Sequence, residues 1–144
     1  MITYKIYKKH LPKYISKQLP ELFYDSSDSF IFDNNTIVVV MWDVGGICGP
    51  DLMGAVALEY KDFIIQDMSP MFDLYIARFE VNKDCLRKGY GKRMYEFIER
   101  NVKSIYKISL IHRAYDKNVS YKFWRAMGFK HVRGSSQYME KKLI

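Results

Sequence analysis

Residues 81–94 combine residue types that can bind an anion. They read Val-Asn-Lys-Asp-Cys-Leu-Arg-Lys-Gly-Tyr-Gly-Lys-Arg-Met, so a strand-like segment gives way to a basic, glycine-bearing turn and then to an amphipathic helix. Gly89 and Gly91 have no Cβ atom, which lets the backbone approach a ligand closely. The free N–H groups of a helix's first turn, with lysine and arginine beside them, favour phosphate. The segment therefore predicts a phosphate-binding turn.

Two commoner phosphate motifs do not fit this turn. The dinucleotide fingerprint Gly-x-Gly-x-x-Gly would need a small residue at position 94, where the chain has Met94, and a Walker loop would need Gly-Lys-Ser or Gly-Lys-Thr. Taken alone, Gly-x-Gly after basic residues is also compatible with an ordinary tight turn. The elements around the turn must decide between the two interpretations.

Length and composition predict one domain covering residues 1–144. The chain is 49% hydrophobic and 16% aromatic, which is enough to build a core. No run approaches the roughly 20 apolar residues of a membrane span, and the basic start of the chain has no apolar signal core. We therefore expect a cytoplasmic protein that does not associate with membranes.

Cysteine and histidine spacings predict neither a metal site nor a disulfide framework. Cys48 and Cys85 fit no zinc spacing and no Cys-x-x-Cys pair, so reduced thiols are expected. His10, His112 and His131 share no ligand spacing, and no metal is expected.

Charge is segregated along the chain. Residues 1–20 carry five lysines and no acid, giving +5; residues 21–80 carry eleven acids and two basic residues, giving −9; residues 81–144 carry sixteen basic and five acidic residues, giving +11. A basic part that holds an anion and an acidic part that attracts a cation would suit an enzyme joining two oppositely charged substrates. The alternative interpretation is that these are simply solvated faces.

Hydrophobic periodicity predicts alternating strands and helices in an α/β or α+β fold with a mixed sheet. Residues 36–43 and 52–60 are expected to form a hairpin, and the first helix is expected to be interrupted near Pro20. The expected strands are 3–7, 36–43, 52–60, 72–81, 107–112, 129–132 and 137–143, and the expected helices are 10–24, 91–103 and 118–127.

A second motif favours the interpretation of the glycine turn as a binding site. Further along the chain stands Asn118-x-Ser120-x-x-Phe123-Trp124-x-x-x-Gly128-Phe129, a short helix that ends in Gly-Phe. The order of strand, basic glycine turn, helix, strand, short helix, Gly-Phe and last strand resembles the GNAT superfamily of N-acetyltransferases, most clearly over residues 72–132. The resemblance implies a single GNAT-like domain with a mixed, mostly antiparallel sheet flanked by helices. Its two central parallel strands, here 72–81 and 107–112, would splay apart and hold acetyl-CoA, with the pyrophosphate on the turn.

The same resemblance assigns residues to the co-substrate acetyl-CoA. The family pattern Gln/Arg-x-x-Gly-x-Gly/Ala falls on residues 86–91, where Leu86 departs from it, so one polar contact is missing while the backbone N–H groups and the basic side chains remain. The backbone of the strand before the turn would bond the pantetheine amides. The implied binding residues are Phe79, Val81, Arg87, Lys88, Gly89, Tyr90, Gly91, Lys92, Asn118 and Trp124.

An acetyl transfer to an amine needs a group that accepts a proton. An alkyl amine with a pKa near ~10.4 is protonated at neutral pH, so a base or a water relay must deprotonate it. Glu80 is the candidate base, because it lies at the end of its strand on the face opposite to Phe79 and Val81. The alternative is an exposed carboxylate paired with Arg78 or a lysine.

The departing thiolate needs a proton or a stabilising charge. Four residues before the Gly-Phe glycine the family often has a tyrosine acid, but this chain has Trp124. Tyr121, one helical turn earlier, is the candidate substitute, with a packed or exposed aromatic as the alternative role. A thiol with a pKa around ~8.5 also leaves as the thiolate, so water can supply the proton.

These residues predict an acetyl-CoA-dependent N-acetyltransferase that transfers acetyl directly to a primary amine, either a small cationic amine or a peptide or protein amine. A second hypothesis is a non-catalytic GNAT-fold sensor or interaction module that binds acyl-CoA, which Leu86 and Trp124 favour. A nucleic-acid binder is favoured only by the net charge of +7, so nucleic acid is not the expected partner. Apolar terminal strands would allow a homodimer.

Overall fold

The computed structural model describes residues 2–8, 10–22, 36–43, 52–66, 69–82, 85, 88–102, 105–111, 117–135 and 137–143. Within these segments, side chains are described except those of residues 20–22, 61–66, 69–72 and 117–119. The glycine-rich connection predicted between residues 43 and 52 lies outside the described residues, as do Arg87 and Leu86.

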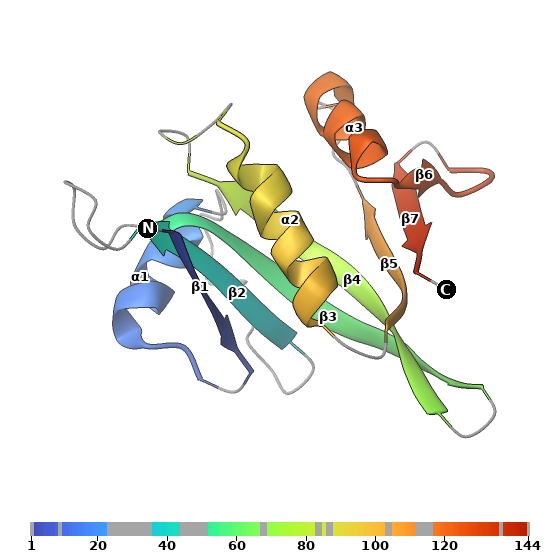
Figure 1. Ribbon diagram of the computed structural model, residues 1–144, viewed down its shortest axis with the longest axis horizontal. Helices are drawn as coiled ribbons and strands as arrows, with labels where there is room; N and C mark the ends of the chain where they lie inside the picture. The colour runs from blue at the N-terminus through green and yellow to red at the C-terminus, as the bar shows by residue number, and fades with distance from the viewer. Residues whose placement is uncertain are drawn as a thin grey trace. The chain divides into compact units, whose positions relative to one another are not determined.

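The described chain forms a mixed sheet with three helices (Figure 1). The seven strands are ordered β1-β2-β3-β4-β5-β7-β6, with β4 and β5 parallel and with antiparallel pairs β1–β2, β5–β7 and β6–β7. The elements are β1 (Ile2–Tyr7), α1 (Lys13–Leu22), β2 (Thr36–Asp43), β3 (Leu52–Gln66), β4 (Ser69–Val81), α2 (Tyr90–Asn101), β5 (Ile105–Ile111), α3 (Lys117–Ala126), β6 (Lys130–His131) and β7 (Tyr138–Lys142).

The parallel pair confirms the mixed, mostly antiparallel sheet expected from the sequence. Its register runs from Phe72 opposite Ile105 to Ile76 opposite Leu110, with a shift between Phe72 and Asp73. Strand β7 then pairs with the other edge of β5, from Lys107 opposite Lys142 to Ile111 opposite Tyr138. The splaying of β4 and β5 stays a prediction.

Two compact units divide the chain, and each is described by itself. The first contains Met1–Leu58 and Arg78–Arg100, and the second contains Glu59–Ala77 and Asn101–Ile144. Strands β3 and β4 each contribute residues to both units.

The core of the first unit is built on β2. Its residues from Thr36 to Met41 are all buried, as expected for a strand with little solvent on either face. Helix α1 contributes Ile15 and Leu19, four residues apart, and α2 contributes Met94, Tyr95 and Ile98, so each helix buries one stripe. The ring of Phe97 in α2 stacks on that of Tyr4 in β1, with 4.3 Å between the centroids.

The second unit has its own core. Its buried apolar side chains come from the parallel pair, from α3 and from the final hairpin, and they include Leu74, Ile76, Ile108, Leu110, Trp124, Phe129 and Met139. This core fixes α3 and the β6–β7 hairpin against the strands of the same unit.

Most predicted elements are present, and their ends differ by a few residues. One expectation is wrong: α1 continues through Pro20 to Leu22 rather than breaking there. Pro20 has no N–H to donate to the carbonyl four residues earlier, that of Ser16, so α1 goes without one backbone bond near its C-terminal end. The neighbouring positions of β2 and β3 agree with the predicted hairpin.

Candidate functional site

The turn before α2 contains a glycine in a conformation that other residues rarely adopt. Gly89 has φ +80°, in the left-handed region. A Cβ placed on it would meet no atom within 4 Å, so the backbone angle, and not lack of space, requires glycine. The Gly89 carbonyl accepts the first helical bond from the Arg93 N–H at 3.2 Å, which marks the start of α2. An α-helix leaves its first-turn N–H groups, here those of residues 90–92, without intrahelical acceptors.

Charge around this turn favours an anion. Helix α2 has no acidic residue in its first turn and has Arg100 in its last, so the positive end of the helix dipole is not neutralised from within the helix. Lys88 and Lys92 are exposed, and the Arg93 guanidinium lies 6.0 Å from the centre of the Tyr90 ring. The geometry suits a ligand that carries phosphate.

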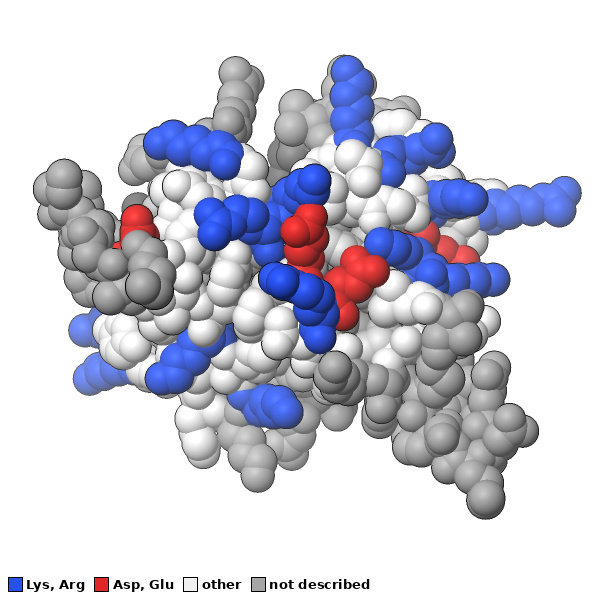
Figure 2. All heavy atoms as spheres, viewed as in Figure 1, with Lys and Arg blue, Asp and Glu red and all other residues white. Residues whose placement is uncertain are grey.

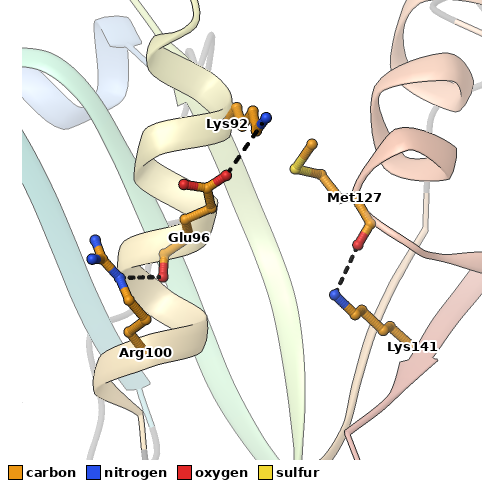
Figure 3. Close-up of polar contacts among 5 residues, drawn as sticks. All are labelled: Lys92, Glu96, Arg100, Met127 and Lys141. Carbon is orange, nitrogen blue, oxygen red and sulfur yellow. Dashed lines mark hydrogen bonds and ion pairs between the residues drawn. The ribbon is translucent and has the colours of Figure 1, made fainter.

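Lys92 also forms an ion pair with Glu96 along the helix. Its Nζ lies 3.8 Å from Glu96 Oε1, and both side chains are at least half exposed, while Arg100 Nε donates to the Glu96 carbonyl at 3.3 Å (Figure 3). Exposed pairs of this kind contribute little because solvent screens them. Figure 2 shows acidic side chains among the basic ones over α2. Lys92 can therefore exchange Glu96 for a bound phosphate at small cost.

Asn82, the residue after β4, holds the beginning of the turn. Its N–H donates to the Met53 carbonyl at 2.6 Å, its Nδ2 donates to the Leu52 carbonyl at 3.1 Å, and its own carbonyl accepts from the Cys85 N–H at 2.8 Å. Sequence reasoning did not single out Asn82. The only available signal was an asparagine placed directly between a strand and a turn, where such side chains often bond to the backbone.

Gly54 in β3 allows α2 to approach the sheet closely. A Cβ there would lie 3.0 Å from the Glu80 carbonyl oxygen and 3.1 Å from the Met94 sulfur. The missing side chain thus sets the distance between β3, the end of β4 and the first turns of α2. Sequence reasoning missed this glycine too, because its neighbours are distant in sequence.

Phe79, Glu80 and Val81 occupy the last positions of β4, and all three are half-buried. The alternation of a strand puts Glu80 on the face opposite to the other two, as expected. The first unit thus places these three residues at one strand end, with Lys88 and Gly89 in the turn that follows and Lys92 in the first turn of α2. The role of Glu80 as a base stays a prediction.

Helix α3, in the second unit, ends in a Schellman motif. The N–H groups of Phe129 and Gly128 donate to the Trp124 and Arg125 carbonyls at 2.9 and 3.0 Å, and Gly128 has φ +98°. The Trp124 ring packs edge-on against that of Phe129, 5.1 Å between centroids, and is 6% exposed. Trp124 is therefore part of the core of this unit, and its predicted contact with acetyl-CoA stays a prediction.

A lysine completes this helix end. Lys141 Nζ, from β7, donates to the Met127 carbonyl at 2.9 Å (Figure 3), and its Cε would lie 3.1 Å from a Cβ at position 128. A positive charge at the negative end of a helix is favourable.

The Tyr121 ring contacts two side chains in the same unit. It stacks on His131 with 4.9 Å between centroids and an interplanar angle of 14°, and the Arg125 guanidinium lies 5.7 Å from its centre. These contacts hold the ring in a defined orientation, but its role as an acid stays a prediction. Asn118 belongs to α3, and its side chain lies outside the described residues.

Lys107 joins three strands of the second unit. Its Nζ lies 3.2 Å from Glu140 Oε2 in β7 and 3.7 Å from Asp73 Oδ2 in β4. Burial lowers the pKa of Lys107, but the hydrogen bond to Glu140 and the two carboxylate charges outweigh it and raise the pKa above its ordinary value. The lysine therefore stays charged and ties β4, β5 and β7 together.

Two features are absent from the part of the chain that the structure describes. In that part no three histidine, cysteine or acidic side chains are grouped so that they could hold a metal ion. No described helix is both long and apolar enough to cross a membrane.

A family model identifies the family to which the chain belongs. The model of the Acetyltransferase (GNAT) family matches residues 3–129, which include both the glycine turn and the end of α3. The chain belongs to the GNAT family of acetyltransferases. No curated protein sequence matched the chain.

Solved GNAT structures share its fold at low sequence identity. A putative N-acetyltransferase YhhK from E. coli, bound to coenzyme A, has a TM-score of 0.68 and 18% identity, with 99% of this chain and 98% of that chain covered. Arabidopsis thaliana NAA60 in complex with acetyl-CoA has a TM-score of 0.68 and 13% identity, with 97% of this chain and 95% of that chain covered. A soil-metagenome aminoglycoside acetyltransferase, meta-AAC0020, in complex with sisomicin has a TM-score of 0.66 and 15% identity, with 94% of this chain and 93% of that chain covered. The GNAT assignment and fold expected from the sequence are confirmed.

Proposed function

We propose that this GNAT protein is an acetyl-CoA-dependent N-acetyltransferase that transfers an acetyl group directly to a primary amine. The observation that carries the proposal is the turn into α2, with Gly89 at φ +80°, no acid in the first helical turn and exposed Lys88 and Lys92 beside it. The coenzyme-bound and acetyl-CoA-bound structures of similar fold support acetyl-CoA as the co-substrate.

In this proposal the first unit binds the coenzyme's pyrophosphate and pantetheine arm. The N–H groups of residues 89–92 donate to the pyrophosphate oxygens, and Arg87, Lys88 and Lys92 add positive charge. The backbone groups of Phe79 and Val81 bond to the pantetheine amides as a neighbouring strand would. In α3 of the second unit, Asn118 and Trp124 complete the predicted coenzyme-binding set.

The chemical step is a direct acyl transfer. Glu80, or a water that it orients, takes a proton from the acceptor ammonium, and the neutral amine nitrogen attacks the thioester carbonyl carbon. The tetrahedral intermediate then collapses: the carbon–sulfur bond breaks, an amide forms, and the coenzyme leaves as the thiolate. The extra proton on the nitrogen passes to water, or to Glu80 after Glu80 has released its first proton to water.

A second residue of this chain protonates the departing thiolate. Tyr121 donates its phenolic proton to the departing sulfur and regains one from water. Its ring is oriented by His131 and Arg125, which is the observation that supports this role.

The acceptor in this proposal is a cationic amine, either small or part of a peptide or protein. The acidic stretch 21–80, with a net charge of −9, would attract such a substrate. The sisomicin complex of meta-AAC0020 supports the small-amine form of the proposal.

Isothermal titration of acetyl-CoA and CoA into the purified protein tests coenzyme binding. We expect binding that is lost in an Arg87→Glu, Lys88→Glu variant. The matched control is Lys13→Glu, Lys17→Glu, which makes the same charge change at two exposed positions of α1. Absence of binding in the unmodified protein, or an equal loss in the control, would overturn the proposal.

An amine panel separates the enzyme from a non-catalytic acyl-CoA sensor. The enzyme predicts release of free thiol from acetyl-CoA with at least one cationic amine, whereas the sensor predicts binding without turnover. Comparison of rate against pH for the unmodified protein and Glu80→Gln then tests the base, because an unchanged profile would remove Glu80 from that role.

A further inference from the structure

We propose that Asn82 is a positioning residue that holds the pyrophosphate-binding turn in place and thereby sets the affinity for the coenzyme. This inference rests on the proposed function, since it concerns the turn to which that proposal assigns the pyrophosphate. Asn82 contacts no reacting atom in this proposal; it acts through the backbone, by way of its bond to the Cys85 N–H.

Asn82 lies at the junction between β4 and the turn. It directly follows Val81, the last residue of β4, and is half-buried. Its N–H and its Nδ2 donate to the carbonyls of Met53 and Leu52, two successive residues at the start of β3. Two bonds from one residue to two successive peptide groups fix both its location and its orientation.

Asn82 is also bonded to the segment that leads to α2. Its carbonyl accepts from the Cys85 N–H at 2.8 Å. At the far end, Gly89 opens α2, and α2 is held against the sheet by Met94 packed over Gly54. The described residues on either side of the turn are thus held, Asn82 by β3 and Gly89 by the first bond of α2.

The Asn82 side-chain bond is costly to lose because it is part-buried. Replacement of Asn82 by alanine keeps the backbone bonds but leaves the part-buried Leu52 carbonyl without the Nδ2 donor. Loss of a hydrogen bond of this kind lowers the equilibrium constant that depends on it roughly 3- to 10-fold. If the bond orients the turn, the affinity for ligands that bind to the turn falls by the same factor.

The structure offers a matched control at the same residue, Leu52. The Leu52 N–H donates to Gln18 Oε1 at 3.2 Å, while Gln18 Nε2 donates to the Tyr14 carbonyl at 3.0 Å. Gln18→Ala therefore also removes a side-chain amide bond to Leu52, but from α1 and away from the turn. A merely structural role predicts similar effects for Gln18→Ala and Asn82→Ala.

The experiment compares two ligands and three variants. CoA carries the pyrophosphate and S-acetyl-pantetheine lacks it. Dissociation constants are measured by isothermal titration for CoA and by NMR amide-shift titration for both ligands. The variants are Asn82→Ala, Gln18→Ala and Asn82→Asp, which keeps the shape of asparagine but cannot donate to the Leu52 carbonyl.

We expect Asn82→Ala to weaken CoA binding roughly 3- to 10-fold and Asn82→Asp to weaken it at least as much, with S-acetyl-pantetheine changed less than about twofold. Gln18→Ala is expected to change neither ligand by more than about twofold. Equal CoA affinity in Asn82→Ala and the unmodified protein would overturn the inference while leaving the proposed function intact. Equal weakening of both ligands, or equal effects of Gln18→Ala, would overturn it as well. A protein that binds no CoA at all would overturn the proposed function itself.

Discussion

Replacement of Gly89 by alanine tests whether the left-handed turn is what holds the coenzyme. Gly89 has φ +80°, and a Cβ at this position would meet no atom within 4 Å. The substitution therefore adds backbone strain without a steric clash. The described chain contains a matched position in the second unit: Gly134, at φ +87°, also has open space around its Cβ position.

The size of the effect follows from the backbone angle. An L-residue in the left-handed region costs roughly 1–2 kcal/mol relative to its preferred conformations. Gly134→Ala should lower the free energy of unfolding by about that amount because the β6–β7 hairpin needs the angle. In Gly89→Ala the exposed turn can relax when empty, so binding must restore the strained angle, and the same energy weakens CoA binding by roughly 5- to 30-fold.

The assay is isothermal titration of CoA into both variants and the unmodified protein, with urea unfolding measured on the same samples. We expect weaker CoA binding in Gly89→Ala and unchanged binding in Gly134→Ala. A CoA dissociation constant for Gly89→Ala within twofold of the unmodified protein would refute the reasoning, as would an equal loss of affinity in Gly134→Ala.

Three further predictions concern packing and ionisation. Gly54→Ala should lower the free energy of unfolding by about 1–3 kcal/mol in urea denaturation, because its Cβ would lie 3.0 Å from the backbone oxygen of Glu80, which cannot move as easily as a side chain; a neutral effect would contradict the close approach. Trp124→Ala should lower the free energy of unfolding by about 3–5 kcal/mol in the same assay, because it leaves a cavity beside Phe129. A decrease of less than about 1.5 kcal/mol would instead indicate that the fold does not depend on the ring. Burial raises the pKa of Tyr7 to about 12, above the unfolded value near 10, so its contribution to stability is complete below about pH 10 and falls as the pH rises to about 12. Denaturation of Tyr7→Phe across that range should show a shallower loss of stability than the unmodified protein, and identical slopes would exclude this ionisation.

The parts of the site that depend on local sequence were predictable. The turn into α2 and the Gly-Phe end of α3 both depend on a glycine at positive φ, a property of the backbone that a few neighbouring letters reveal. Gly128 predicted the end of the helix at residues 118–127, and the structure has a Schellman motif there. The order of these local motifs was also enough to indicate the GNAT fold.

The parts that depend on contacts between distant segments were missed. The Asn82 side chain bonds to Leu52, thirty residues away, and Gly54 matters because Glu80 and Met94 lie against it. An asparagine after a strand and a glycine within one are both common, so neither shows its partners in the sequence. Trp124 illustrates the same limit, since its letter fits a pocket wall as well as the core position that it occupies.

The sequence by itself determined where the chain must turn, which stripe of each helix is apolar, and that a basic glycine turn leads into a helix, because these follow from backbone sterics and periodicity over a few residues. Only the tertiary structure decided how the turn is held. Its support comes from hydrogen bonds and van der Waals contacts among β3, β4, α1 and α2. Such contacts form only when the fold brings distant residues within about 3–4 Å of one another, and no local pattern encodes that approach.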